Sequence, residues 1–155
     1  MVITEKKIYQ AYYTKSAPIV DYMVNQLNLK ATDIILEPCG GDGAFVSAIL
    51  NKNINAQIDV WELNPNSVTS LRENFISYSN VSIHEIDTIL SRDLNLSSLS
   101  EIKFDKIIAN PPYGAWQDYD KRKLIKKIYP GIYTKESYAL FLYRSIELLK
   151  NEGIL

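Results

Sequence analysis

The chain has 155 residues, of which 46% are apolar and 23% charged, and its net charge is −1. This size and composition predict a single globular domain over residues 1–155 and exclude a disordered or repeat protein. A net charge this small does not attract nucleic acid to the whole surface, so a nucleic-acid-binding face has to be local or supplied by another segment.

The first third of the chain predicts a helix, a buried strand and a second helix. Ser16 is placed to cap the first helix, and the apolar run at residues 34–36 is typical of a buried strand that ends at Glu37. The second helix is expected over residues 44–50, directly after a group of glycines. The apolar residues expected on one face of the first helix are Ile19, Val20, Met23, Val24 and Leu27.

The middle of the chain repeats this alternation. We expect the second strand at residues 58–62, and Asn64 followed by Pro65 marks the start of another helix. The third strand is expected at residues 81–86, with Asp87 at its end. The apolar residues that the helix would bury are Val68, Leu71 and Phe75.

The last third predicts one more strand and the longest helix. Residues 88–103 are expected to form a loop or a short helix, and residues 104–109 the fourth strand. The longest helix is expected over residues 136–150. After a turn at residues 151–153, the apolar pair at residues 154–155 predicts the start of a fifth strand.

Strands that alternate with helices predict an α/β fold, a doubly wound Rossmann-like sheet. The expected strand order is about 3-2-1-4 with the start of strand 5, which would leave the sheet C-terminally incomplete. Because an unfinished parallel sheet exposes an apolar edge, we expect a missing C-terminal region, a partner chain or self-association near Ile154 and Leu155.

Cysteine content and hydropathy bear on the compartment. The single cysteine, Cys39, excludes an internal disulfide and argues against a cysteine-based metal site. No apolar stretch reaches the roughly 18 residues that a membrane span needs, and residues 1–7 lack the apolar core of a signal peptide. We therefore expect a cytoplasmic protein without a membrane partner.

The loop at residues 37–43 has the features of a nucleotide-binding turn. Its glycines lie between a strand and a helix, where they let the backbone pass close to a ligand. Glu62, at the end of the next strand, can accept hydrogen bonds from both ribose hydroxyls, and Asp87 can accept one from an adenine amino group. The alternative for each acid is a solvated carboxylate at a strand end.

A second motif follows the fourth strand, with the sequence Asn-Pro-Pro-Tyr. An amino group on an sp² carbon is a poor nucleophile, and two acceptors aimed at its N–H bonds can draw its lone pair out of conjugation. The Asn110 side chain and the Pro111 carbonyl supply such acceptors, and Pro111 and Pro112 fix the backbone between them. The ring of Tyr113 can stack on a planar base. The alternative is a proline-rich turn with a core tyrosine.

At these motifs the chain resembles the gamma group of DNA adenine-N6 methyltransferases, the group typical of restriction-modification systems. Residues 10–14 resemble the N-terminal Tyr-Tyr-Thr-Pro motif of that group, although Lys15 stands where proline is usual. The resemblance implies S-adenosyl-L-methionine as the cofactor and an adenine flipped out of DNA as the target. It implies no metal. The implied catalytic residues are Asn110, Pro111, Pro112 and Tyr113, and the implied cofactor-binding residues are Tyr13, Thr14, Glu37, Pro38, Cys39, Gly40, Gly43, Glu62, Leu63, Asp87, Thr88, Asn110 and Phe141.

The chain departs from this group at its C-terminus. Members of the group continue through further strands, an aromatic residue that stacks on the flipped base, and a target-recognition domain. We therefore expect a site-specific adenine methyltransferase whose 155 residues alone are nearly inactive. The basic run at residues 121–127 is either a contact with DNA phosphate or a solvated helix face.

Two alternatives to DNA adenine methylation remain open. Methyltransferases that act on release-factor glutamine or on ribosomal RNA also use Asn-Pro-Pro-Tyr or close variants. A non-catalytic fragment that binds the cofactor or assembles with another chain is the second alternative.

Overall fold

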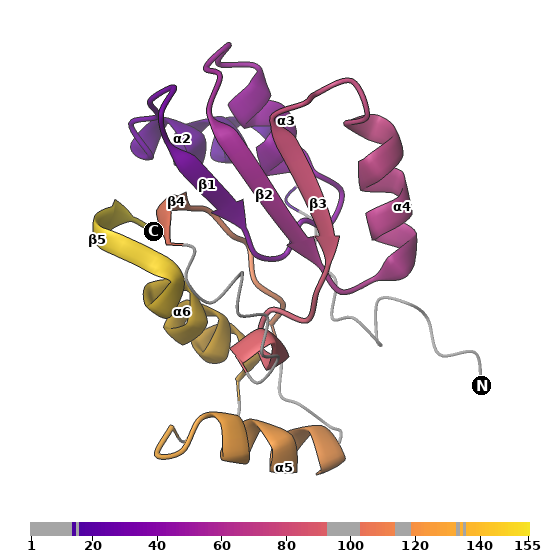
Figure 1. Cartoon of the computed structure of the whole chain (residues 1–155), viewed down its shortest axis with the longest axis vertical. Helices are drawn as coiled ribbons and strands as arrows, with labels where there is room; N and C mark the ends of the chain where they lie inside the picture. Colours follow the sequence, from indigo (N-terminus) through magenta and orange to yellow (C-terminus); the bar gives the residue numbers. More distant parts are fainter. Residues whose placement is uncertain (1–13, 15, 93–102, 114–118, 133, 135) are drawn as a thin grey trace.

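A computed structural model describes residues 14, 16–92, 103–113, 119–132, 134 and 136–155. Within them the chain alternates helices and strands, as the sequence predicts (Figure 1). The elements are α2 (Ala17–Gln26), β1 (Ile34–Glu37), α3 (Ala44–Leu50), β2 (Gln57–Glu62), α4 (Pro65–Asn74), β3 (Val81–Glu85), the 3₁₀ turn η1 (Leu90–Arg92), β4 (Phe104–Ile107), α5 (Tyr119–Ile128), α6 (Ser137–Leu148) and β5 (Leu149–Ile154).

The strands form one parallel sheet in the order β3-β2-β1-β4-β5. This confirms the predicted order of the first four strands and places the fifth beside β4. Because all five strands run in one direction, their carboxyl ends lie along the same edge of the sheet.

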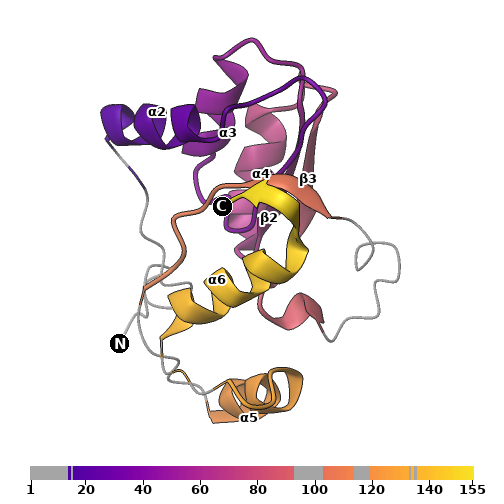
Figure 2. The ribbon, with the colours of Figure 1, turned by 90° about the vertical axis from the view of Figure 1, so that its left-hand side faces the viewer.

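Side chains that alternate along β1 divide the core between the two faces of the sheet. Ile35 packs with residues of α2, α3 and α4 on one face, whereas Leu36 packs with Leu148 of α6 on the other. Both β1 side chains are completely buried. Figures 1 and 2 show α6 on a different side of the sheet from α2 and α3, with α5 at the opposite end of the molecule from α2 and α3.

Two predicted helix starts have different outcomes. Asn64 caps α4 as predicted, because its side-chain oxygen accepts a hydrogen bond from the Asn66 backbone N–H at 3.0 Å. Ser16 occupies the cap position of α2, but its side chain makes no cap hydrogen bond there. The predicted apolar face of α2 is also narrower than expected, because Ile19 is 54% exposed while Val20 and Val24 are buried.

The C-terminal boundary was predicted wrongly. The helix ends at Leu148 instead of Lys150, and β5 begins at once with Leu149 opposite Phe104 of β4. The predicted turn is an irregularity inside this strand, where Glu152 takes a positive φ of 66°. Pairing with β4 therefore overrides the helical pattern of the sequence at this point.

Other boundaries are close to the predictions. The predicted loop or short helix after Asp87 contains η1, and residues 93–102 lie outside the described part of the chain. The basic run at residues 121–127 lies within α5. Across the described residues, every helix is too short or too polar to serve as a bilayer span.

Candidate active site

Four polar residues of the predicted site lie at the carboxyl edge of the sheet. Glu37 ends β1 and Glu62 ends β2, while Asp87 lies two residues after the end of β3 and Asn110 comes shortly after β4. Their position follows from the parallel sheet, since each strand delivers its last residues to the same edge.

Glu37 is a buried carboxylate with one unsatisfied oxygen. Its side chain is 2% exposed, and no hydrogen bond reaches its Oε2 atom from any described residue. Burial raises the pKa of Glu37 well above its ordinary value, the Asp42 charge adds to the increase, and a hydrogen bond from the Val46 backbone opposes it. A buried acceptor without a donor fits a ligand that brings a cation, such as the amino group of an amino acid.

Glu62 is held in place by two backbone donors. Its Oε2 atom accepts from the Gly41 N–H at 2.8 Å, and its Oε1 atom accepts from the Asn64 N–H at 2.7 Å. The carboxylate therefore joins the glycine loop to the start of α4. Because a carboxylate offers about four acceptor positions, two further donors such as ribose hydroxyls can still be accommodated.

In the structure, two glycines of this loop are needed for packing within the protein, whereas the sequence predicts them for contact with a ligand. A Cβ atom on Gly40 would lie 2.4 Å from a side-chain carbon of Val60, and one on Gly43 would lie 2.6 Å from the ring of Phe75. Both glycines thus allow the loop to pack against β2 and α4. The predicted backbone contact of Gly40 and Gly43 with a cofactor stays a prediction.

Gly43→Ala should destabilise the protein by roughly 3 kcal/mol, because the position combines a φ of +79° with overpacking against Phe75 and Leu71. Gly131→Ala is the matched control, since Gly131 has a φ of +84° and nothing within 4 Å of its added Cβ. The two variants share the backbone strain and differ in the clash. Urea unfolding that gives equal losses for both would contradict the packing role of Gly43.

Asp87 and Thr88 are both engaged by the protein itself. Asp87 Oδ1 accepts from the backbone N–H groups of Ile89 and Leu90, each at 3.1 Å, while Lys121 Nζ donates to Asp87 Oδ2 at 2.8 Å. The Thr88 hydroxyl donates to the Pro38 carbonyl. Thr88 therefore ties the loop after β3 to the loop after β1, which the sequence did not predict.

Asn110 lies against the cofactor loop. Its side-chain nitrogen donates to the Thr14 hydroxyl at 2.9 Å, so the nitrogen end of the carboxamide faces the N-terminal segment. Its backbone also hydrogen-bonds Cys39, whose thiol pKa is raised by burial and then by the Glu37 and Glu62 charges. The structure therefore brings the predicted catalytic residue and the predicted cofactor residues into one site.

The catalytic loop is anchored on α6 by a residue that the sequence did not predict. The hydroxyl of Ser137, which is completely buried, donates to the Pro112 carbonyl at 2.6 Å. Next to this bond the rings of Tyr113 and Tyr138 lie 6.3 Å apart, with exposed fractions of 53% and 44%. A serine at a helix start carries no sequence signal for such a distant partner.

The remaining predicted residues lie around this centre. Leu63 is 39% exposed, as a residue that contacts a ligand can be, whereas Phe141 is buried in a cluster that includes Cys39. Tyr13 lies outside the described residues.

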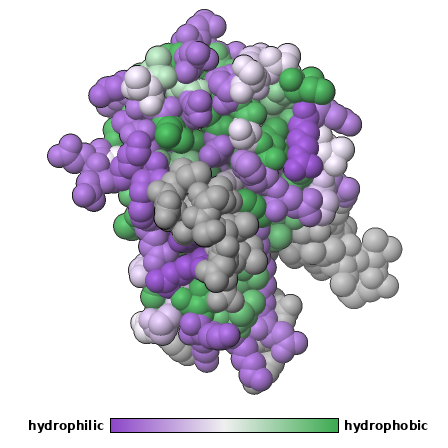
Figure 3. All heavy atoms as spheres, viewed as in Figure 1, coloured by the Kyte–Doolittle hydropathy of each residue, from purple (hydrophilic) through white to green (hydrophobic). Residues whose placement is uncertain are grey.

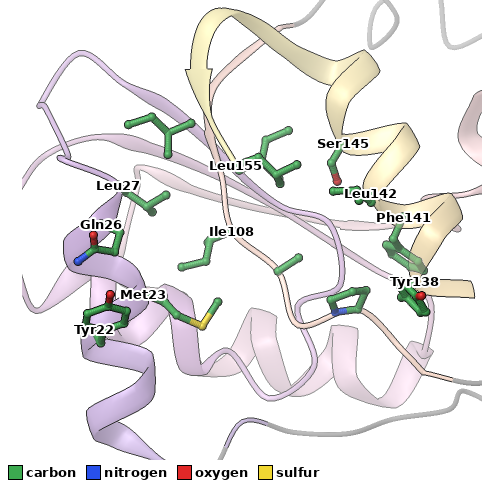
Figure 4. A pocket seen from close by; sticks show the side chains of 14 residues that line it. Tyr22, Met23, Gln26, Leu27, Ile108, Tyr138, Phe141, Leu142, Ser145 and Leu155 are labelled. Carbon is green, nitrogen blue, oxygen red and sulfur yellow. The ribbon is translucent and has the colours of Figure 1, made fainter.

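An apolar cleft of about 350 Å³ lies between α2 and α6. Figure 4 shows side chains of both helices pointing into it, among them Met23 from α2 and Phe141 from α6. Pro111 of the catalytic motif lines one part of the cleft, and the predicted association residues Ile154 and Leu155 line another. Association through these residues stays a prediction.

Helix α5 has one buried and one basic face. Ile125 and Ile128 pack inward, and the lower end of the molecule in Figure 3, at which α5 lies, carries hydrophilic patches beside hydrophobic ones. The exposed basic residues of the helix are Arg122, Lys123, Lys126 and Lys127.

Solved structures with the same fold include a modification subunit of a type I restriction enzyme from Vibrio vulnificus YJ016. It superposes with a TM-score of 0.72 at 20% identity and covers 91% of this chain and 31% of its own. This similarity concerns the fold.

The sequence relatives include a Type II methyltransferase and a ribosomal RNA methyltransferase. The Type II methyltransferase M.AccI of Acinetobacter calcoaceticus is 32% identical over 82% of this chain and 23% of its own length. Ribosomal RNA small subunit methyltransferase A of Pseudomonas fluorescens is 31% identical over 70% of this chain and 38% of its own length. The chain thus spans less than two fifths of the length of either relative.

A family model matches nearly the whole chain. The Eco57I restriction-modification methylase model matches residues 3–155, which include the glycine loop, all three acids at the strand ends and the Asn-Pro-Pro-Tyr motif. The chain therefore belongs to the Eco57I restriction-modification methylase family.

Proposed function

We propose that the protein transfers a methyl group from S-adenosyl-L-methionine to the N6 amino group of adenine in DNA. Its family makes the chain a methyltransferase domain of the restriction-modification type, for which S-adenosyl-L-methionine is the methyl donor. The observation that carries the proposal is the contact of Asn110 with both Thr14 and Cys39, which sets an amide next to the cofactor loop.

The residues at the strand ends fit the cofactor. Glu37 would accept the amino group of the methionine part, since its unsatisfied buried oxygen lacks a donor among the described residues. Glu62 would accept hydrogen bonds from the ribose hydroxyls, and Asp87 would accept one from the adenine amino group. The bound cofactor supplies an electrophilic methyl group.

The catalytic loop would activate the acceptor nitrogen. The carboxamide oxygen of Asn110 and the carbonyl oxygen of Pro111 would accept hydrogen bonds from the two N–H groups of the target amine. These hydrogen bonds would make its lone pair more nucleophilic. Anchoring by Ser137 holds the backbone of this loop before the substrate arrives. Tyr113, which is half exposed, would stack on the flipped adenine. Proton loss follows methyl transfer, so the mechanism needs no titrating base.

Ribosomal RNA is the second candidate acceptor, and the similarity to ribosomal RNA small subunit methyltransferase A supports it. The family match over nearly the whole chain favours DNA. A role on chromosomal DNA agrees with the cytoplasmic location expected from the sequence.

The basic face of α5 would contact DNA phosphate. Four basic residues are exposed on one ten-residue helix in a chain whose net charge is −1, so positive charge is concentrated there. The double variant Lys126→Gln, Lys127→Gln should lower the slope of log affinity for duplex DNA against log salt by about 1.8, that is, about 0.9 for each lost phosphate contact. Fluorescence anisotropy at several salt concentrations measures this slope.

The control carries the same loss of charge elsewhere. Lys30→Gln with Lys52→Gln removes two lysines near the amino end of the sheet and should leave the slope nearly unchanged. Equal slopes for the two double variants would show that α5 is only a solvated helix.

Two measurements test the proposed function. Calorimetric titration with S-adenosyl-L-methionine should show binding by the wild type, a loss of at least about tenfold for Glu62→Ala, and little change for Asn110→Ala. Because these 155 residues alone are expected to be nearly inactive, transfer of labelled methyl groups is measured with the protein in excess over DNA, and nucleoside mass spectrometry should then find N6-methyladenine in DNA. Absence of cofactor binding would overturn the assignment of S-adenosyl-L-methionine as the methyl donor. Methylation of ribosomal RNA in place of DNA would overturn the assignment of DNA as the acceptor.

A further inference from the structure

Lys121 reaches from the first turn of α5 to the site proposed for the cofactor adenine. Its Nζ atom lies 2.8 Å from Asp87 Oδ2, and the two side chains are only 19% and 16% exposed. The pair is therefore shielded from water. A charge interaction in such a shielded place is stronger than one at the surface.

The other bonds of Asp87 leave it little freedom. Among the described residues, the Ile89 and Leu90 backbone N–H groups donate to its Oδ1 atom, so Lys121 takes the third of about four acceptor positions. The remaining position lies on Oδ2, beside Lys121. The direction in which Asp87 can accept a further hydrogen bond is thus determined by the lysine.

Lys121 is itself held by the packing of its helix. The Arg92 side chain donates to the Ile128 carbonyl at 2.7 Å, and the Tyr129 hydroxyl donates to the Ile89 carbonyl at 2.6 Å. These bonds join α5 and the segment after it to the loop that carries Asp87, and make the Lys121–Asp87 pair part of one packed unit.

We infer that Lys121 is a positioning residue for recognition of the cofactor adenine: it orients Asp87 so that its one remaining acceptor position receives the adenine amino group. The inference rests on the proposed function, because Asp87 receives that amino group only if the site binds S-adenosyl-L-methionine. Lysine and amino group share the carboxylate and do not compete for it.

The test compares two ligands by calorimetry. One is S-adenosyl-L-homocysteine, and the other is the same compound with hydrogen in place of the adenine amino group. The wild type should prefer the amino compound by about tenfold or more, the usual effect of a hydrogen bond to a charged group. Lys121→Met, which keeps much of the aliphatic part of the side chain, should reduce the ratio of the two affinities to nearly one. Lys121→Arg should restore part of it, and Lys30→Met should leave it unchanged.

The outcomes separate this inference from the proposed function. An unchanged preference in Lys121→Met, or an equal loss of affinity for both ligands, would overturn the positioning role. A larger preference in Lys121→Met would show that the lysine competes with the amino group, which also overturns it. Failure of the wild type to bind either ligand would overturn the proposed function together with the inference.

Discussion

Glu37→Gln is expected to weaken the binding of S-adenosyl-L-methionine by at least about 100-fold while it stabilises the cofactor-free protein. The affinity falls because a buried charge partner of the ligand amino group is removed, a change that costs about 3–5 kcal/mol. The stability rises because glutamine has nearly the same shape and carries no charge into a site where no described residue pairs with Glu37 Oε2.

The difference in stability between Glu37→Gln and the wild type should depend on pH. Burial raises the pKa of Glu37, so the stability that its protonated form contributes is complete at low pH and is lost as the pH rises through the raised pKa. The stability gain of Glu37→Gln over the wild type should therefore grow with pH. Urea unfolding between about pH 5 and 9 measures this gain.

Cofactor binding should depend on the same ionisation. At a pH where Glu37 is protonated in the cofactor-free protein, binding of a cationic ligand requires Glu37 to lose its proton. The affinity of the wild type should therefore increase with pH, and Glu37→Gln should not show this increase. Glu73→Gln, an exposed glutamate of α4, is the control for both measurements. A Glu37→Gln protein that binds the cofactor normally would remove Glu37 from the proposed site.

The parts of the site that the sequence predicted are those that strand ends determine. Glu37, Glu62 and Asn110 could be placed because parallel strands deliver their last residues to one edge, whatever the details of packing. Asn64 was predictable as a helix cap because that signal involves residues close in sequence.

The parts that the sequence did not predict depend on contacts between distant segments. Ser137 contacts Pro112, and Lys121 contacts Asp87, across 25 and 34 residues of chain. Neither residue differs in type from many surface residues, so nothing local indicates its partner. The end of α6 also differs from the prediction, because the pairing of Leu149 with β4 outweighs local helix propensity.

The role of Asn110 depends on the orientation of its carboxamide. The nitrogen end donates to the Thr14 hydroxyl, so the amide has a defined direction before any substrate binds. The Cys39 contact holds the backbone of the same residue against the cofactor loop. A side chain fixed at both ends can present its oxygen to a target amine without reorganisation during the reaction.

Asn110→Ala should therefore reduce single-turnover methyl transfer by about 10²–10³-fold, the usual effect of removing one preorganised polar group at the reacting atom. Cofactor affinity should change little, since the bonds of Glu37 and Glu62 do not involve this side chain. Asn110→Asp keeps an acceptor oxygen that the Thr14 hydroxyl can donate to, and should retain part of the rate. Asn74→Ala, at the exposed end of α4, is the control. Equal rates for Asn110→Ala and this control, measured by quenched-flow transfer of labelled methyl groups, would exclude activation of the amine by Asn110.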